Sequence, residues 1–285
     1  PDRSQGRRPR RAGVQGGGTK TAIGAAMDIR FGASVEEFMA YVTDIGLVHV
    51  EFKREYLAGH PDTPTPEEVR ELAASYDVTV TYHAPFRDWN LGSYNETVRQ
   101  NAVDRVKQTL DDAATAGATG VVVHGGSVPH RYPEWIRERA AESARRSLRA
   151  CAEYAQSVGV PLCLENQPPD PQQQRYTTSP DALARMLDAI DVPAPYLSVT
   201  LDVGHAKLTG DDWRAFVDRF GDRIRVCHLH DNDGTADQHQ PFPEHEAVIQ
   251  SVPAECFAFE MKSVADVGRW VGTDLTPPST TAGPY

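Results

Sequence analysis

The chain has 285 residues, a formal net charge of -11 and 24% charged residues. It has no run of about 18 apolar residues and no apolar segment behind its first basic stretch, which argues against a membrane span and a secretory signal. Residues 1–20 carry six basic residues and one acidic residue, a local charge of +5, which leaves -16 on residues 21–285 and disfavours broad binding to nucleic acid.

The composition divides the chain into three parts. Residues 1–20 are rich in arginine and glycine and poor in apolar side chains, so we expect a disordered basic tail. Residues 21–272 have the pattern of one folded domain, and residues 273–285 are expected to form a flexible tail. Four cysteines without C-x-x-C spacing favour reduced core residues in a cytoplasmic protein: Cys151, Cys163, Cys227 and Cys256.

Short apolar runs alternate with longer amphipathic segments throughout residues 21–272. Strands are expected near 21–28, 47–52, 78–83, 119–124, 160–165, 197–202, 223–230 and 255–260. Helices are expected near 33–44, 65–76, 95–116, 132–158, 178–190, 210–220, 243–251 and 262–271. Eight such pairs in one α/β domain predict closure into a (β/α)8 TIM barrel.

Residues typical of helix ends support these boundaries. Thr65-Pro66 and Ser179-Pro180 combine an N-cap with proline at the first helical position. Glycines follow three of the expected helices, at Gly46, Gly117 and Gly159.

The alternation of side chains along each expected strand places ionisable groups inside the barrel. In the second strand, Val50 and Phe52 face outward and His49 and Glu51 face inward. The inward groups at or near the strand ends are His83, His124, Glu165, Asp202 and Glu260. Because the carboxyl ends of barrel strands share one rim, we expect these side chains to converge there.

A further group lies in the segment 224–239, which reads IRVCHLHDNDGTADQH. His228 and His230 share one face of the expected strand, while Asp237 and His239 follow in the loop. His205 comes shortly after Asp202. Carboxylates gathered at one rim repel one another unless a cation joins them, so we expect one to three divalent metal ions. Mixed nitrogen and oxygen ligands favour zinc or manganese.

Several motifs resemble those of the xylose isomerase-like TIM barrel superfamily. They are YHAPF with NLGS (82–86 and 90–93), VVVHGG (121–126), LCLENQP (162–168), LDVGHA (201–206), CHLHDNDG (227–234), DQH (237–239) and FAFE (257–260). The superfamily includes sugar phosphate isomerases and epimerases and also endonuclease IV, of AP endonuclease family 2. The resemblance implies a metal-dependent enzyme, and a homo-oligomer, since relatives are often dimers or tetramers.

The resemblance also implies which side chains hold metal. The four-ligand set of the sugar-processing branches matches Glu165, Asp202, His228 and Glu260. The additional ligands of endonuclease IV match His83, His124, His205, Asp237 and His239. His228 is preferred to His230 as the strand ligand because it fits the superfamily's His-x-x-Asp pattern.

Three functions remain open at this point. A sugar or sugar-phosphate isomerase or epimerase would use Glu165 and Glu260 as ligands and as an acid/base pair. Zinc-dependent cleavage of abasic DNA would use the same ligands to generate hydroxide. A metal-binding barrel without catalysis is the third. The acidic body, and expected rim loops without a basic cluster, favour a small-molecule sugar.

Candidate substrate contacts lie beside the metal ligands. Phe86 and Trp89, in the loop after His83, would form an apolar wall against a sugar ring. His230 and Asp231 are candidates for binding sugar hydroxyls.

Overall fold

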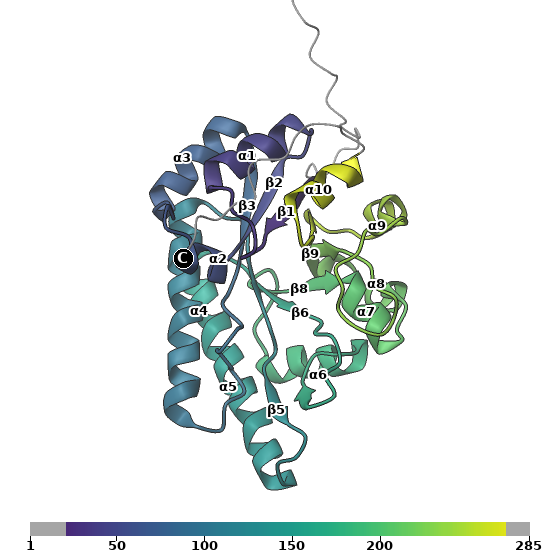
Figure 1. Cartoon of the computed structure of the whole chain (residues 1–285). Helices are drawn as coiled ribbons and strands as arrows, with labels where there is room; N and C mark the ends of the chain where they lie inside the picture. The colour runs from purple at the N-terminus through teal and green to yellow at the C-terminus, as the bar shows by residue number, and fades with distance from the viewer. Residues whose placement is uncertain (1–20, 272–285) are drawn as a thin grey trace, which may run out of the picture.

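The computed structural model describes residues 21–271, which form a closed barrel of eight parallel strands with helices outside it (Figure 1). The barrel strands are β1 (Ala22–Met27), β2 (His49–Lys53), β3 (Thr79–His83), β4 (Val121–Val123), β6 (Leu162–Glu165), β8 (Leu197–Asp202), β9 (Ile224–Leu229) and β10 (Cys256–Phe259). Each strand pairs with the next in this series, and β10 pairs with β1. The predicted TIM barrel is confirmed, and the predicted tails, 1–20 and 273–285, lie outside the described residues.

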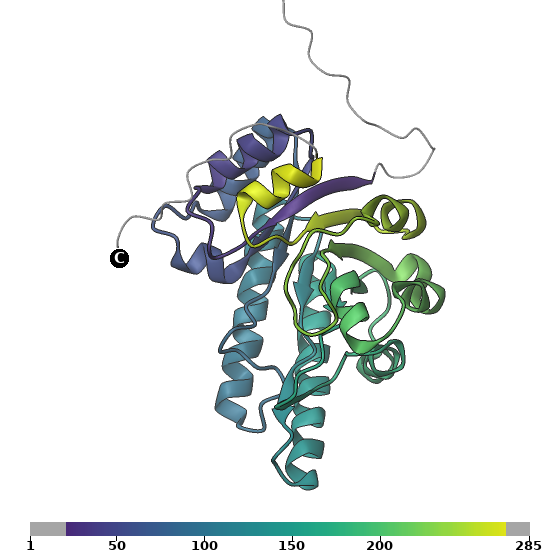
Figure 2. The ribbon, with the colours of Figure 1, turned by 45° about the vertical axis from the view of Figure 1, so that its right-hand side comes forward.

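The expected helices are all present within a few residues of their predicted bounds. They are α1 (Val35–Asp44), α3 (Pro66–Tyr76), α4 (Glu96–Ala116), α5 (Glu134–Val158), α6 (Pro180–Ile190), α8 (Trp213–Phe220), α9 (His245–Ser251) and α10 (Val264–Val271). The longest two, α4 and α5, lie side by side (Figure 2).

The helix ends use the residues that the sequence analysis identified. Thr65 accepts a hydrogen bond from the Glu68 backbone, and Glu68 bonds back to Thr65, which forms a capping box at α3. Ser179 caps α6 through the Ala182 backbone. Gly117 ends α4 with a φ of 72°, a backbone conformation that costs glycine little.

Five short elements were not predicted. They are α2 (Arg54–Gly59), β5 (Ser127–Pro129), β7 (Gln173–Arg175), α7 (Val203–Thr209) and the 3-10 helix η1 (Gly221–Arg223). Helices α2 and α7 start directly at a strand end, so no turn residues separate them from the strand. Strands β5 and β7 are three residues each and pair with one another in two rim loops, which is too short for an alternating pattern.

The barrel wall has the predicted inward and outward faces. Val50 and Phe52 of β2 are fully buried in the main apolar cluster with residues of the helices. His49 and Glu51 are also fully buried, but they face the polar barrel interior, where His49 bonds to Thr79 and Thr81.

All four cysteines are buried and unpaired. Among residues 21–271, no helix combines the length and apolarity that crossing a membrane requires.

Candidate metal centre and active site

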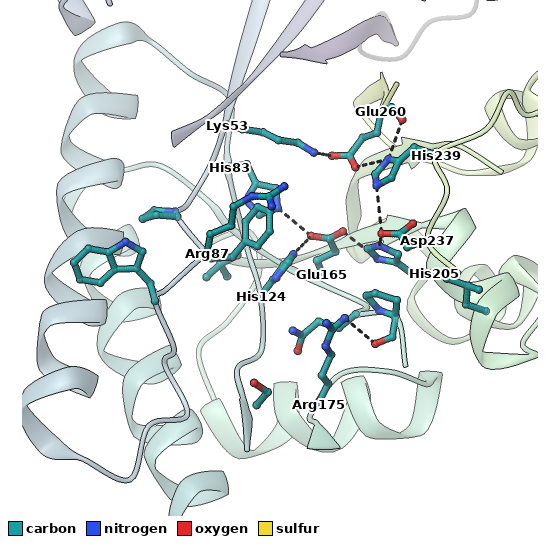
Figure 3. Close-up of a pocket in the computed structure, with 18 of the residues that line it drawn as sticks. Lys53, His83, Arg87, His124, Glu165, Arg175, His205, Asp237, His239 and Glu260 are labelled. Carbon is teal, nitrogen blue, oxygen red and sulfur yellow. Dashed lines mark hydrogen bonds and ion pairs between the residues drawn. The ribbon is translucent and has the colours of Figure 1, made fainter. Parts of the chain in front are cut away.

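A cavity of about 620 Å³ opens at the carboxyl ends of the barrel strands. Its lining includes Lys53 of β2, His83 of β3, Glu165 of β6 and Glu260, which directly follows β10. Figure 3 shows Glu165 among histidines on both sides. A cavity of this size is suitable for a small ligand.

Glu165, the last residue of β6, is the carboxylate on which most of these side chains converge. Its Oε2 lies 3.2 Å from His83 Nε2 and 3.0 Å from His124 Nε2. Its Oε1 lies 3.3 Å from His205 Nδ1 and also 3.3 Å from His228 Nδ1. Burial alone would raise the pKa of Glu165, but the neighbouring imidazoles, His124 foremost, hold that pKa well below its usual value. Glu165 is therefore ionised.

A second, deeper group surrounds His228 of β9. His228 Nδ1 lies 3.3 Å from Glu165 Oε1, 3.7 Å from Asp202 Oδ2 and 3.5 Å from Glu260 Oε1. Burial alone would lower the pKa of His228, but nearby carboxylates, Glu51 and Glu260 foremost, raise that pKa well above its usual value. One imidazole nitrogen thus faces carboxylates from the ends of three strands.

A third group lies toward the loop after β9. Asp237 Oδ2 is 3.4 Å from His205 Nε2 and 3.2 Å from His239 Nε2. Asp237 Oδ1 is 3.7 Å from His230 Nδ1, and His230 Nε2 is 2.9 Å from Asp202 Oδ2. His230 and His205 therefore connect this group to the deeper carboxylates.

His230 can occupy this position because residue 204 is glycine. A Cβ atom on Gly204 would lie 2.2 Å from His230 Cε1, closer than real Cβ contacts allow. Gly204 belongs to the first turn of α7, whose N-cap is Asp202. Asp202 Oδ1 accepts a hydrogen bond from the His205 backbone at 2.8 Å, so one carboxylate both caps α7 and faces the histidines.

Backbone carbonyls orient three of the histidines. His83 Nδ1 donates to Ala84 O at 2.8 Å, His205 Nδ1 to Asn166 O at 2.9 Å and His239 Nδ1 to Glu260 O at 2.9 Å. Each bond fixes a proton on Nδ1 and leaves Nε2 turned to a carboxylate. This is the arrangement by which proteins prepare imidazole as a metal ligand.

The donor set fits a divalent metal. Glu51 Oε1, His230 Nδ1 and Asp237 Oδ1 are buried and have no hydrogen-bond partner within the part of the chain that the structure describes. Unpaired buried acceptors are costly, and a cation bound beside His230 and Asp237, which share one group of possible ligands, would remove that cost for these two atoms. Within residues 21–271, five groups of three His, Asp or Glu residues have ligand atoms within 4.8 Å of one another, and these groups together include all nine predicted ligands.

Of the four residues predicted to contact the substrate, two line the cavity and two do not. The Phe86 ring lies 5.0 Å from His83 and 4.6 Å from His124, and both Phe86 and Trp89 line the cavity. His230 is fully buried, and Asp231 accepts a hydrogen bond from Lys207 Nζ at 2.7 Å. Neither is among the residues that line the cavity, so this geometry gives no support to their predicted contacts with sugar hydroxyls.

Two side chains of β2 belong to the site although the sequence analysis gave them no role. Glu51 Oε2 lies 3.1 Å from His228 Nε2, and Lys53 Nζ lies 2.9 Å from Glu260 Oε1. Burial alone would raise the pKa of Glu260, but Lys53 and His228 hold it well below its usual value. The alternation of side chains along the strand predicted that Glu51 faces inward. Lys53 is on the same face as Glu51, but it lies one residue beyond the predicted end of the strand.

Separate loops also bring single cations to the cavity, although none of these loops has a basic cluster in the sequence. Arg30, Arg175 and Lys262 line it, and each comes from a different segment, so they form no cluster in the sequence. Arg30 pairs with Asp28 at 2.5 Å and Arg175 with Asp170 at 3.0 Å. The charges of Arg30 and Arg175 are therefore largely compensated by these carboxylates.

The chain belongs to the xylose isomerase-like TIM barrel family, whose model matches residues 39–261. It is 32% identical over 172 residues to an uncharacterized protein of Methanocaldococcus jannaschii, covering 59% of this chain and 57% of that one. It is 25% identical over 177 residues to fructoselysine 3-epimerase of Escherichia coli O157:H7, covering 61% of this chain and 62% of the relative.

A third relative is a probable endonuclease 4 of Mycobacterium ulcerans, 28% identical over 184 residues, with 62% of this chain and 68% of the relative covered. Among solved structures, a D-tagatose 3-epimerase-like protein has the same fold, with a TM-score of 0.74, 24% identity and coverage of 88% of this chain and 94% of that one. The match spans less than two thirds of the length of the first two relatives.

Proposed function

We propose that this protein is a metal-dependent isomerase or epimerase of a small sugar or sugar phosphate, which moves a proton at a carbon next to a carbonyl group. The observation that carries the proposal is the arrangement of four side chains. Glu165 and Glu260 open onto the cavity, whereas Asp202 and His228 lie buried beneath them. The carboxylates of Glu165, at the end of β6, and Glu260, directly after β10, can thus face the same substrate.

Glu165, Asp202, His228 and Glu260 would hold the principal metal ion, and their mixed nitrogen and oxygen donors favour zinc or manganese. When bound, the cation supplies Lewis acidity toward the oxygens of the carbonyl and the adjacent hydroxyl. Names of relatives agree with this chemistry, since they include fructoselysine 3-epimerase and a D-tagatose 3-epimerase-like protein.

The glutamates would carry out the proton transfer. One ionised carboxylate takes the proton from the carbon beside the carbonyl, and the electron pair of the broken C–H bond moves toward the carbonyl oxygen. Because both glutamates are ionised at rest, the glutamate on the other side would first take up a proton from solvent and then donate it to carbon, and the first glutamate would release its proton to solvent. Lys53 holds Glu260 at Oε1, and Oε2, which lies 3.6 Å from His239 Nδ1, would be the atom for this step.

The cavity wall would position the substrate and exclude water. Phe86 and Trp89 offer apolar surface to a sugar ring. Arg87 has its guanidinium carbon 5.3 Å from the centre of the Phe86 ring and also lines the cavity, so it could contact a phosphate group. The four buried, unpaired cysteines support a reducing compartment such as the cytoplasm.

Exchange of a carbon-bound hydrogen of the substrate for deuterium tests the proposal directly. The metal-loaded protein would be incubated in deuterated water with D-tagatose, D-fructose and their 6-phosphates. The expected result is deuterium on a carbon next to the carbonyl of at least one sugar. No exchange and no epimer with any of these ketoses would count against this function.

A second candidate is hydrolysis of a phosphodiester at an abasic site. One observation favours it: histidines outside the four-residue set take part in three further groups of possible ligands among the described residues, namely His83 with His124 and Glu165, His205 with Asp202 and His230, and His239 with His230 and Asp237. Several metal ions could then activate water and stabilise the leaving oxygen. The charge of -16 on residues 21–285 weighs against DNA binding. Scission of an abasic-site duplex by the metal-loaded protein would establish this alternative. Failure of both assays would favour a metal-binding barrel without catalysis.

A further inference from the structure

A chain of hydrogen bonds runs from the candidate metal centre down through the barrel interior and is buried except at its far end, where Thr79 is exposed. His228 Nε2 lies 3.1 Å from Glu51 Oε2, and Thr81 Oγ1 donates to the same oxygen at 3.1 Å. His49 Nε2 lies 3.1 Å from Thr81 Oγ1, and His49 Nδ1 lies 2.9 Å from Thr79 Oγ1. Side chains of β2, β3 and β9 thus form one polar column.

The chemistry of these groups fixes the direction of each bond. A carboxylate oxygen only accepts, so both His228 Nε2 and the Thr81 hydroxyl donate to Glu51. Thr81 has one proton and has given it to Glu51, so it accepts from His49 Nε2. Hence Nε2 of His228 carries a proton that it gives to Glu51. By the same rule Nδ1 donates to Glu165 Oε1, 3.3 Å away, while no metal is bound. A metal would replace the proton on Nδ1, because Nδ1 lies among the carboxylates of the proposed site. That nitrogen faces Glu165, Asp202 and Glu260.

The orientation of His228 differs from that of its neighbours. His83, His205 and His239 are each held through Nδ1 by a backbone carbonyl, and each turns Nε2 to a carboxylate. His228 is held through the other nitrogen: the Glu51 side chain accepts from its Nε2, and its Nδ1 has no backbone carbonyl as a partner among the described residues but faces Glu165, Asp202 and Glu260. Its position as a ligand therefore depends on the identity of residue 51.

We propose that Glu51 is a positioning residue, which selects the tautomer of His228 that binds metal through Nδ1. The inference rests on the proposed metal-dependent function, because Glu51 would orient one of the four side chains that hold the metal. These side chains are Glu165, Asp202, His228 and Glu260. Glu51 acts through His228 and lies beneath the cavity, outside its lining. Removing such a carboxylate weakens metal binding about 10- to 100-fold in comparable sites.

Metal affinity tests the proposal with two variants. Zinc dissociation constants would be measured by competition with a chromophoric chelator for the wild type, Glu51→Leu and Glu51→Gln. We expect Glu51→Leu to bind zinc about 10- to 100-fold more weakly. Glu51→Gln, which keeps an acceptor oxygen and the side-chain size, should lose less and should alter the visible spectrum of the cobalt-loaded protein.

Thr79→Val is the matched control. It removes a hydroxyl from the same column, where Thr79 contacts His49 rather than His228, so zinc affinity and the cobalt spectrum should remain unchanged. Unchanged affinity and spectrum in both Glu51 variants would overturn the proposal even if the wild type binds zinc and exchanges deuterium.

Nitrogen-15 NMR of the zinc-loaded wild type reports the state of each His228 nitrogen. This test does not depend on whether a Glu51 variant folds. We expect His228 to show a protonated Nε2 and a metal-bound Nδ1. Coordination through Nε2 would overturn the role of Glu51 without affecting the proposed function. A wild type that binds no zinc, manganese or cobalt would overturn both.

Discussion

At the scale of single residues, the two glutamates proposed for proton transfer, Glu165 and Glu260, have different neighbours. Glu165 faces nitrogens of His83, His124, His205 and His228, whereas the shortest ion pair of Glu260 is with Lys53, at 2.9 Å. Both carboxyl groups have a pKa well below the usual value despite burial, because cationic neighbours outweigh the cost of desolvation. Both are therefore ionised at neutral pH and able to accept a proton.

Replacing either glutamate should remove activity and preserve the fold. For Glu165→Gln and Glu260→Gln we expect deuterium exchange to fall about 100- to 10,000-fold, since an amide cannot act as a general base. The measurement is the exchange rate together with circular dichroism. Glu67→Gln, at a surface position of α3, is the control and should keep the full rate. Exchange near the wild-type rate in both site variants would rule out the proposed roles.

Gly204 should not tolerate a larger side chain. Gly204→Ala places Cβ against the buried ring of His230, and overpacking of this kind costs about 1–3 kcal/mol of unfolding free energy. Gly59→Ala is the control, because nothing lies within 4 Å of a Cβ there. Urea denaturation compares the two. Equal stability of both variants would contradict the close packing of His230 on α7.

The pH dependence of stability should differ between the metal-free and metal-loaded protein. Carboxylate neighbours raise the pKa of His205 and His228 well above 6.5 despite burial. In the metal-free protein, their contribution to stability is complete below about pH 6.5 and is lost as the pH rises through the folded-state pKa. Metal competes with the same protons, so zinc should raise Tm more at pH 8 than at pH 6. Differential scanning calorimetry measures the rise in Tm on adding zinc at each pH. A larger rise at pH 6 than at pH 8 would contradict the prediction.

At the scale of elements, the strong periodic patterns were predictable and the short elements were not. Helix α3 was predicted with its cap because Thr65-Pro66 precedes a full amphipathic pattern. Helix α7 was missed because Asp202 is both the last residue of β8 and the N-cap of α7. A strand that passes directly into a helix has no turn residues by which sequence can separate the two.

The capping box of α3 should make a measurable contribution to stability. Thr65→Ala removes the oxygen that accepts from the Glu68 backbone, and loss of such a cap costs about 1 kcal/mol. The midpoint of urea denaturation reports the change. Ser75→Ala, whose hydroxyl bonds only within the same helix, should leave the midpoint unchanged or slightly higher. A Thr65→Ala midpoint equal to the wild type would show that this cap is not needed.

At the scale of the whole molecule, the barrel brings together side chains from His83 to Glu260. The sequence predicted their meeting because carboxyl-terminal strand ends share one rim. It did not predict the roles of Glu51 and Lys53, because contacts across the barrel to β9 and the residue after β10 depend on side-chain reach and not on strand order. It likewise could not separate the buried His230 from cavity-lining residues.

The central claim is that these side chains bind a divalent cation, and metal content after dialysis tests it most directly. The purified protein would be equilibrated with zinc or manganese, dialysed against metal-free buffer and analysed by inductively coupled plasma mass spectrometry, beside the Glu165→Gln variant. We expect one to three equivalents of metal per chain in the wild type and fewer in the variant. A wild type that retains no metal, or a variant that retains the same amount, would contradict the account.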